Sequence, residues 1–369
     1  MASVRKIAQQ AGVSISTVSR ALNNDSAVNP QTRARVLAVA NSFGYVATVG
    51  RRTTTNIGFA YTGESTLADP FDSAVLHGAT RGLDECRFDV VLLNLQRDRD
   101  REETYTQFFM RKGVRGVVLR TTAESRSVCE EIAQEGFPHV VISERFEVPG
   151  MSFVDCDSKA DSMRAVEYLV ALGHRRIAFA MHNVPDRDHA DRFEGYRIAL
   201  ENGGIALDDS LVFKQKFTLA GGATVLKLAI SMASPPTAIY FADPLLAVGA
   251  VNKAHKLGIR IPDEMSIIGF DDTDVRYSVY PTLTAVCQDA SALGFEAALW
   301  LTRRVSGSVN HDTLQKTLPT FFEVNQSTGP APQPVCQTVM KQAAMDVERA
   351  RTHATDSTVA RLRQTGSDM

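Results

Sequence analysis

Short apolar runs alternate with amphipathic stretches along residues 57–305, and this alternation restricts the possible folds more than any other feature of the chain. Buried parallel strands are continuous apolar runs, and the helices that connect them form βαβ units. The predicted strands are 57–61, 90–93, 116–119, 139–142, 177–181, 238–241 and 266–270. The predicted helices are 72–85, 101–113, 124–135, 158–172, 189–202, 219–233, 243–257 and 290–305. The pattern therefore predicts an α/β fold with doubly wound parallel sheets.

The region 56–330 holds too many predicted strands for one compact sheet, so we divide it into two lobes. Lobe 1 would comprise about 56–155 and 288–316, and lobe 2 about 156–287 and 317–330. Ligands of open α/β sheets bind at the carboxyl ends of the strands. Two lobes that face each other therefore predict a cleft for a small molecule.

The first 46 residues have a different pattern, which predicts three short helices. Helix 4–10 carries apolar residues at i, i+3 and i+4, and Gly12 allows a tight turn after it. Ser14 suits the N-cap of the second helix, and the third begins at Pro30 and ends at Gly44. The predicted interior is Ile7, Val13, Val18, Leu22, Val36, Leu37 and Phe43. Three such helices predict a helix-turn-helix domain.

The outward face of the second helix combines short polar groups with one guanidinium, as a helix in a DNA major groove requires. Its residues are Ile15, Ser16, Ser19, Arg20 and Asn23. Residues 1–52 carry seven Lys and Arg against Asp25 alone, a net charge of +6, so the remainder of the chain carries −8. A basic segment on an acidic body is typical of a protein that meets phosphate through one small domain. The alternative is an ordinary helical bundle with a solvated basic surface.

Other classes of protein lack support in the sequence. No apolar run reaches 18 residues, and the N-terminus leads directly into helix 4–10, so we expect no signal peptide, no membrane span and a cytoplasmic, nucleoid-associated location. The five cysteines are scattered and form no CxxC pair, which favours neither disulfides nor zinc. The chain has no phosphate-binding glycine loop, nucleophile elbow or His-Glu-x-x-His. We therefore expect no enzyme, cofactor or metal site.

Four motifs occur along the chain in a specific order. Residues 8–23 read Ala-x-x-Ala-Gly-Val-Ser-x-x-Thr-Val-Ser-Arg-x-Leu-Asn, and 174–178 read His-Arg-Arg-Ile-Ala. Residues 266–272 read Ser-Ile-Ile-Gly-Phe-Asp-Asp, and 281–288 read Pro-x-Leu-Thr-x-Val-x-Gln. Over about residues 3–330 the chain thereby resembles the lactose-repressor/galactose-repressor (LacI/GalR) family of bacterial transcription factors.

The resemblance implies a homodimeric regulator, usually a repressor, which binds pseudo-palindromic operator DNA. Its core would resemble periplasmic sugar-binding proteins, and a small-molecule effector between the lobes, a sugar or sugar derivative, would change the operator affinity. The expected DNA contacts are Ser14, Ile15, Ser16, Thr17, Ser19, Arg20, Asn23, Thr32, Arg51 and Arg52. An alternative regulator of the same fold would respond to a protein partner or to a non-sugar ligand. A transport-type binding protein would share the core but would not carry the DNA-binding segment.

Three residues of lobe 2 are expected to bind the effector. Arg192 matches the family's arginine that bonds effector hydroxyls, and the alternative is a helix-surface arginine paired with Glu194 or Asp191. Asp271 matches the family's effector-binding aspartate, and the alternative is a turn-forming Asp after a strand. Gln288 lies at the predicted crossover between the lobes, where it would serve as hinge, ligand contact or both.

Three residues of lobe 1 complete the expected effector site. Arg120 follows the strand 116–119 and, with Arg192, would hold an anionic ligand such as a uronate or sugar phosphate. Its alternative is an arginine salt-bridged on the rim. Tyr61 and Phe71 flank the first strand-to-helix loop, where a ring would stack on a sugar face. Phe71 would equally pack the helix that follows.

The chain departs from the family pattern at several places. Ala242 replaces an amide that the family commonly has, while Asp243 is expected to cap the next helix. The linker 47–55 is short, rich in threonine and without the family's leucine, so we expect no helix there that wedges the operator. Arg51 and Arg52 would follow phosphates or enter a minor groove. The tail 331–369 has no leucine heptad, and we expect it to be disordered.

Overall fold

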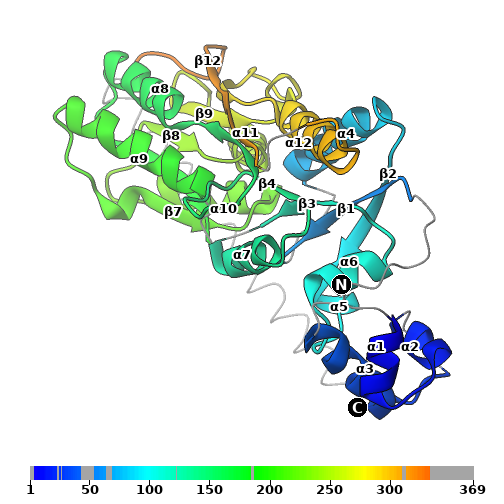
Figure 1. The fold of residues 1–369 in the computed structure, drawn as a ribbon. Coiled ribbons are helices and arrows are strands. Elements are labelled where there is room, and N and C mark those ends of the chain that lie inside the picture. The colour runs from blue at the N-terminus through cyan, green and yellow to red at the C-terminus, as the bar shows by residue number, and fades with distance from the viewer. Residues whose placement is uncertain are drawn as a thin grey trace, which may run out of the picture. The chain divides into compact units, whose positions relative to one another are not determined.

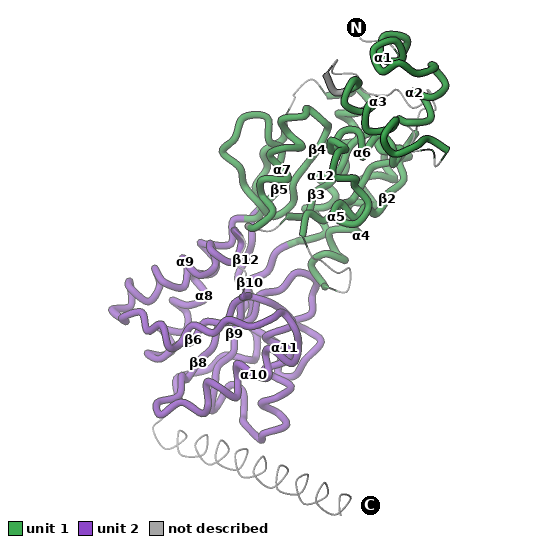
Figure 2. The backbone as a smooth tube through the Cα atoms, turned by 90° about the horizontal axis from the view of Figure 1, so that it is seen from below, with its two compact units in different colours: residues 1–156, 289–318 green, residues 157–288, 319–369 purple. Residues whose placement is uncertain are grey.

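The computed structural model describes residues 4–22, 25, 27–42, 54–63, 69–121, 123–183, 187–309 and 313–332. The chain divides into two compact units, which are coloured separately in Figure 2. Unit 1 consists of residues 1–156 and 289–318, and unit 2 of residues 157–288 and 319–369. The chain therefore passes between the units three times, at 156/157, 288/289 and 318/319.

The N-terminal segment of unit 1 consists of helices α1 (Val4–Ala11), α2 (Ile15–Leu22) and α3 (Pro30–Ser42), as Figure 1 shows. Gly12 has a φ of +64°, the left-handed conformation that the predicted turn requires. The amide of Thr17 donates to Ser14 Oγ at 3.0 Å, which confirms the predicted N-cap. The fully buried interior includes Ile7, Val18, Val36 and Ala40, whereas Val13 and Leu22 are only partly buried.

Unit 1 contains a six-stranded sheet in the order β11-β5-β4-β3-β1-β2. Its strands are β1 (Asn56–Tyr61), β2 (Asp89–Asn94), β3 (Val117–Arg120), β4 (His139–Ile142), β5 (Phe153–Asp157) and β11 (Gln315–Pro319). Its helices are α4 (Pro70–Asp84), α5 (Leu95–Asp98), α6 (Tyr105–Arg111), the 3₁₀ turn η1 (Ala123–Ser125), α7 (Arg126–Gln134) and α12 (Ala290–Val305). Side chains alternate along each strand, so Phe59 packs with α4 and α12, and Ala60 packs with α6 and α7. Both faces of this sheet are covered by helices.

Unit 2 repeats this architecture with the strand order β12-β10-β9-β8-β6-β7. Its strands are β6 (Ile177–His182), β7 (Val212–Gln215), β8 (Ala238–Phe241), β9 (Ser266–Asp271), β10 (Thr284–Cys287) and β12 (Phe321–Glu323). Its helices are α8 (Lys159–Ala171), α9 (Arg187–Asn202), α10 (Leu219–Ile230) and α11 (Pro244–Lys256), with 3₁₀ turns η2 (Asp209–Leu211) and η3 (Val275–Tyr277). β12 is antiparallel to β10, and the other pairs are parallel. The carboxyl ends of β6, β8, β9 and β10 therefore share one edge of the sheet.

The structure confirms the α/β class and corrects several predicted elements. The strand predicted at 116–119 begins one residue later, and β5, β7, β10, β11 and β12 were not predicted. β7, β11 and β12 lie at sheet edges, where few of their side chains are buried, so they lack a continuous apolar run. The helix predicted at 101–113 is wrong in its first turn, because Thr104 forms a capping box with Gln107 and starts α6 there.

Several other predictions concern sites and segments outside the two sheets. Within the described ranges, no helix is long and apolar enough to cross a membrane, and no cluster of His, Cys, Asp or Glu is arranged to hold a metal ion. Residues 43–53 and 333–369 lie outside the described residues, and so do Asn23, Phe43, Gly44, Arg51 and Arg52. The predictions for the linker and the tail therefore stay predictions.

Candidate functional site

The exposed face of α2 presents the side chains that were predicted to contact DNA. Ile15 is 50 % exposed, Ser16 and Ser19 are exposed, and the side chain of Arg20 is 63 % exposed. Arg20 Nε lies 3.9 Å from Asp25 Oδ2, an exposed ion pair that contributes little to stability. The guanidinium can therefore leave Asp25 for another acceptor at small cost.

Three hydroxyls at the start of α2 and one arginine hold this helix in place. Ser14 Oγ lies 2.8 Å from both Ser16 Oγ and Thr17 Oγ1, in addition to its bond with the Thr17 amide. Arg33 Nη2 donates to the Asp25 carbonyl at 2.6 Å and so ties α3 to the loop after α2. Arg33 was predicted only to add positive charge, and its structural role was missed.

Arg192 lies on α9 with its guanidinium at the carboxyl edge of the unit 2 sheet. The residue is only 5 % exposed, Nη1 donates to the Ala242 carbonyl at 2.8 Å, and Cζ lies 3.4 Å from the centre of the Phe270 ring. Asp188 Oδ2 is 3.9 Å from Nη2. Nε is buried and has no hydrogen-bond partner in the described parts of the chain. This environment suits a buried polar ligand.

The alternative interpretation of Arg192 as a surface arginine is wrong. Glu194 pairs with Arg197 at 2.9 Å, Asp191 pairs with Arg187 at 3.5 Å, and Arg192 is buried instead of lying on the helix surface. Ala242 stands where the family commonly has a residue with an amide side chain. It accepts a hydrogen bond from Arg192 through its main-chain carbonyl. Asp243 Oδ1 accepts from the Leu246 amide at 3.0 Å, which confirms the predicted cap of α11.

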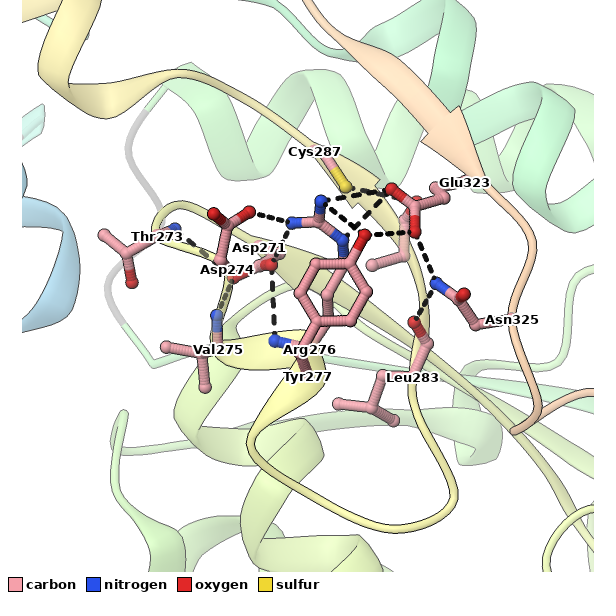
Figure 3. Close-up of polar contacts among 11 residues, drawn as sticks. Asp271, Thr273, Asp274, Val275, Arg276, Tyr277, Leu283, Cys287, Glu323 and Asn325 are labelled. Atoms are coloured by element: carbon pink, nitrogen blue, oxygen red, sulfur yellow. Dashed lines mark hydrogen bonds and ion pairs between the residues drawn. The ribbon is translucent and has the colours of Figure 1, made fainter.

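Asp271 ends β9 and is engaged with its own loop (Figure 3). Oδ1 accepts from the amides of Thr273 at 3.3 Å and Val275 at 3.0 Å. Oδ2 accepts from Arg276 twice, from its amide at 3.3 Å and from Nη1 at 2.6 Å. The carboxylate therefore stabilises a turn, as the alternative interpretation predicted, and its contact with an effector stays a prediction.

Gln288 is the last residue of unit 2 before the chain enters unit 1. Its amide donates to the Asp271 carbonyl at 3.0 Å, and its Nε2 donates to Asp272 Oδ1 at 2.5 Å. Its Oε1 is buried and accepts no hydrogen bond from any residue that the structure describes. Gln288 thus offers an acceptor at the same sheet edge as the Arg192 donor.

In unit 1, Arg120 and Phe71 pack against each other. Arg120 Nε donates to Asp72 Oδ1 at 3.0 Å, and Cζ lies 4.5 Å from the Phe71 ring centre. Both charged side chains are mostly buried, so the predicted salt bridge exists but does not lie on an exposed rim. Phe71 belongs to the core between the sheet and α4, which confirms that it packs the helix. The nearby Tyr61 ring is partly buried and lies edge-on to Phe59 at 5.5 Å.

Burial also acts on the acidic side chain that begins α4. Asp69 Oδ1 accepts from the Phe71 amide at 2.9 Å and caps the helix. Burial, together with the neighbouring Asp72, raises the pKa of the Asp69 carboxyl above its ordinary value. Arg120 is therefore accompanied by two acidic side chains of its own unit.

The structure adds Ser143, which the sequence analysis missed. Ser143 directly follows β4, is 1 % exposed and has a φ of +58°, a conformation that non-glycine residues rarely adopt. Its Oγ is buried and unpaired among the described residues. Strained residues with unsatisfied polar groups cluster at binding sites. The only sequence signal was a polar residue immediately after an apolar run.

A second missed residue is Phe217, which follows β7. The His182 ring lies 4.2 Å from it and the His189 ring 4.8 Å, measured between ring centres. His182 ends β6 and His189 lies on α9, so the three rings gather at the carboxyl edge of the unit 2 sheet. Since β7 was not predicted, nothing in the sequence analysis placed Phe217 at this edge.

Comparisons with known proteins cover both parts of the chain. Residues 3–48 match the family described as "Bacterial regulatory proteins, lacI family", and residues 166–328 match "Periplasmic binding protein-like domain". The HTH-type transcriptional regulator DegA of Bacillus subtilis is 31% identical over 340 residues, which cover 88% of this chain and 97% of DegA.

Two solved structures show the same similarity in three dimensions. The transcriptional regulator CelR-cellobiose complex superposes with a TM-score of 0.64 at 27% identity, over 89% of this chain and 100% of the other. A LacI family transcriptional regulator from Enterococcus faecium with bound ribose superposes with a TM-score of 0.65 at 26% identity, over 74% and 99%. Both proteins are named as regulators, and each is named with a carbohydrate.

Proposed function

Because the chain belongs to the lacI family of bacterial regulatory proteins and is a DNA-binding transcriptional regulator, we propose that it is a repressor controlled by an uncharged carbohydrate. We propose further that it acts as a homodimer on a pseudo-palindromic operator. The α2 face of each protomer would enter one major groove, with Ile15, Ser16 and Arg20 at the base edges. Ser14, Thr17, Ser19, Asn23 and Thr32 would position the domain on the backbone.

The observation that carries the effector proposal is a pair of unsatisfied atoms at the carboxyl edge of the unit 2 sheet. Arg192 Nε is a donor and Gln288 Oε1 is an acceptor, and both are buried without a partner in the described chain. A sugar hydroxyl donates one hydrogen bond and accepts others, so hydroxyls satisfy both atoms. The Phe217 ring at the same edge offers an apolar surface for a sugar ring. The effector contacts that were predicted for Arg120 and Tyr61 of unit 1 stay predictions.

The charge balance favours an uncharged ligand over a uronate or sugar phosphate. Arg192 faces Asp188 in unit 2, and Arg120 is paired with Asp72 in unit 1. An anionic ligand at either guanidinium would lie close to the carboxylate that this guanidinium already neutralises, and the two negative charges would repel each other. Ribose and cellobiose, which accompany two of the similar structures, are both uncharged. The prediction of an anionic ligand is therefore the less favoured one.

The experiment is calorimetry with a panel of sugars on the full chain. D-ribose and cellobiose represent uncharged carbohydrates, and glucuronate and glucose 6-phosphate represent anionic ones. Arg192→Gln should weaken binding of the sugar that binds wild type by about tenfold or more, because a charge-assisted hydrogen bond is lost. Arg197→Gln is the matched control, since Arg197 lies on the same helix but has a side chain that is 41 % exposed and pairs with Glu194.

Two outcomes would contradict the proposal. Equal affinity in Arg192→Gln and Arg197→Gln would remove Arg192 from the site. Tighter binding of glucuronate or glucose 6-phosphate than of the uncharged sugars would reject an uncharged effector. Circular dichroism of each variant separates loss of binding from loss of folding.

A further inference from the structure

Asp271 has no free acceptor capacity in this structure. A carboxylate has about four lone-pair positions, and the four donors described above occupy them. Three of these bonds come from main-chain amides at 3.0–3.3 Å, and the shortest comes from Arg276 Nη1 at 2.6 Å. An effector hydroxyl that bonds Asp271 must therefore replace a donor, and the long amide contacts are the weakest.

Arg276 joins Asp271 to two further carboxylates (Figure 3). Its side chain is 8 % exposed; Nη1 also donates to Asp274 Oδ1 at 2.8 Å, and Nη2 lies 3.1 Å from Glu323 Oε2. One guanidinium thus stands among three carboxylates, which would repel one another without it. The ring of Tyr277 lies 4.3 Å from Arg276 Cζ and covers the cation.

Glu323 connects this cluster to β12. Its Oε1 accepts from Tyr277 Oη at 2.7 Å and from Asn325 Nδ2 at 2.9 Å, and these two bonds lower the pKa of its carboxyl. Asn325 Nδ2 also donates to the Leu283 carbonyl at 3.0 Å, beside the start of β10. β12 is the first strand after the last passage of the chain from unit 1 to unit 2. The cluster therefore links the loop after β9 to the segment that re-enters unit 2.

We propose that Arg276 is a positioning residue that holds Asp271 ready for an effector hydroxyl and transmits the binding of that hydroxyl to β12 through Glu323. This inference rests on the proposed function, because it takes Asp271 as an effector contact. When a hydroxyl replaces the long amide contacts, the carboxylate shifts, and the short bond to Arg276 moves with it. The bonds of Arg276 to Asp271 and to Glu323 then change together, so that binding of the effector changes the stability of β12.

The first test needs no sugar and uses amide hydrogen exchange of the full chain. Arg276→Gln should speed exchange by about tenfold or more both at residues 273, 275 and 276, whose amides bond Asp271, and at β12. Asp274→Asn is the matched control, because Asp274 bonds the same guanidinium but is 75 % exposed and, in the part of the chain that the structure describes, bonds no residue of β12. Arg276→Lys keeps a cation beside Asp271, but its single ammonium nitrogen cannot also reach Glu323 as the wider guanidinium does. It should restore protection at residues 273, 275 and 276 and leave β12 unprotected.

The second test adds D-ribose and cellobiose. The sugar that binds wild type should slow exchange at β12, and Glu323→Gln should abolish this slowing while the affinity for the sugar changes by less than about threefold. Protection of β12 that persists in Glu323→Gln would overturn the proposal. Exchange in Arg276→Gln no faster than in Asp274→Asn would overturn it as well. Failure of both sugars to bind counts against the proposed function, whereas the sugar-free test still decides the role of Arg276.

Discussion

Arg20 is the single residue on which the base preference of this protein should depend most strongly. Its side chain is exposed on α2 and bound only loosely to Asp25. Arg20→Ala should cost about 1–3 kcal/mol at the preferred site and relax the preference at one base pair per half-site, because a bidentate contact with guanine is lost. Selection from random-sequence DNA measures the preference, and titration of the selected site measures the affinity.

The control for Arg20→Ala is Thr32→Val on α3, where a phosphate contact is expected. It should weaken all sequences alike and leave the preference unchanged. If Arg20→Ala selected the same sequences as wild type, α2 would not be the recognition helix that we take it to be.

The same scale shows how far side-chain roles follow from sequence. Arg192 was identified by its match to the family's arginine, but its burial over Phe270 depends on three elements that meet only in the fold. Asp271 was identified as well, but its hydrogen bond with the Arg276 guanidinium could not be predicted, because only the turn of the loop brings the two side chains together. Ser143 and Phe217 carried no motif, and their importance comes from backbone conformation and ring packing.

At the scale of elements, α4 and α12 of unit 1 pack with their main chains close together. A Cβ on Gly78 would overlap the carbonyl oxygen of Ser291, and a Cβ on Gly294 would overlap that of Val75. Main chain cannot move aside as a flexible side chain can, so Gly78→Ala should destabilise the chain by about 1–3 kcal/mol or more. Urea unfolding measures the difference. His77→Ala, at an exposed position of the same helix, should change stability by less than about 0.5 kcal/mol.

Equal stability of Gly78→Ala and His77→Ala would show that α4 and α12 do not pack as closely as described.

The burial of each strand explains which parts of the fold were predictable. Central strands such as β4 and β8 are continuous apolar runs, because helices cover both of their faces. None of the residues of the edge strands β7, β11 and β12 is fully buried, so composition did not distinguish these strands from loops.

For the whole molecule, the prediction concerns the linker 47–55, which joins the DNA-binding segment to the core. The sequence has neither the leucine nor the helix propensity for a wedge at the operator centre, so affinity should depend on salt and little on the central base step. Replacing Arg51 and Arg52 together by Ala should flatten the slope of log affinity against log salt by up to about two units. Titrations at several salt concentrations measure this slope. An ordered linker helix with a side chain between the central base pairs, seen in a DNA complex, would reject the prediction.

The three passages of the chain between the units also determine the order in which the protein can mature on the ribosome. The helices α1, α2 and α3 are contiguous in sequence, and their core contains only residues of this segment. This bundle can therefore fold as soon as it leaves the ribosome. The remainder of unit 1 must wait, because α12 supplies Leu293, Ala297 and Leu301 to its core and is translated only after residues 157–288. The strands of unit 1 that are synthesised early therefore lack part of their core while most of unit 2 is made. Contacts between segments so far apart in sequence form late, which slows folding and leaves apolar surface exposed. Nascent chains of this protein should need protection by chaperones mainly in that interval.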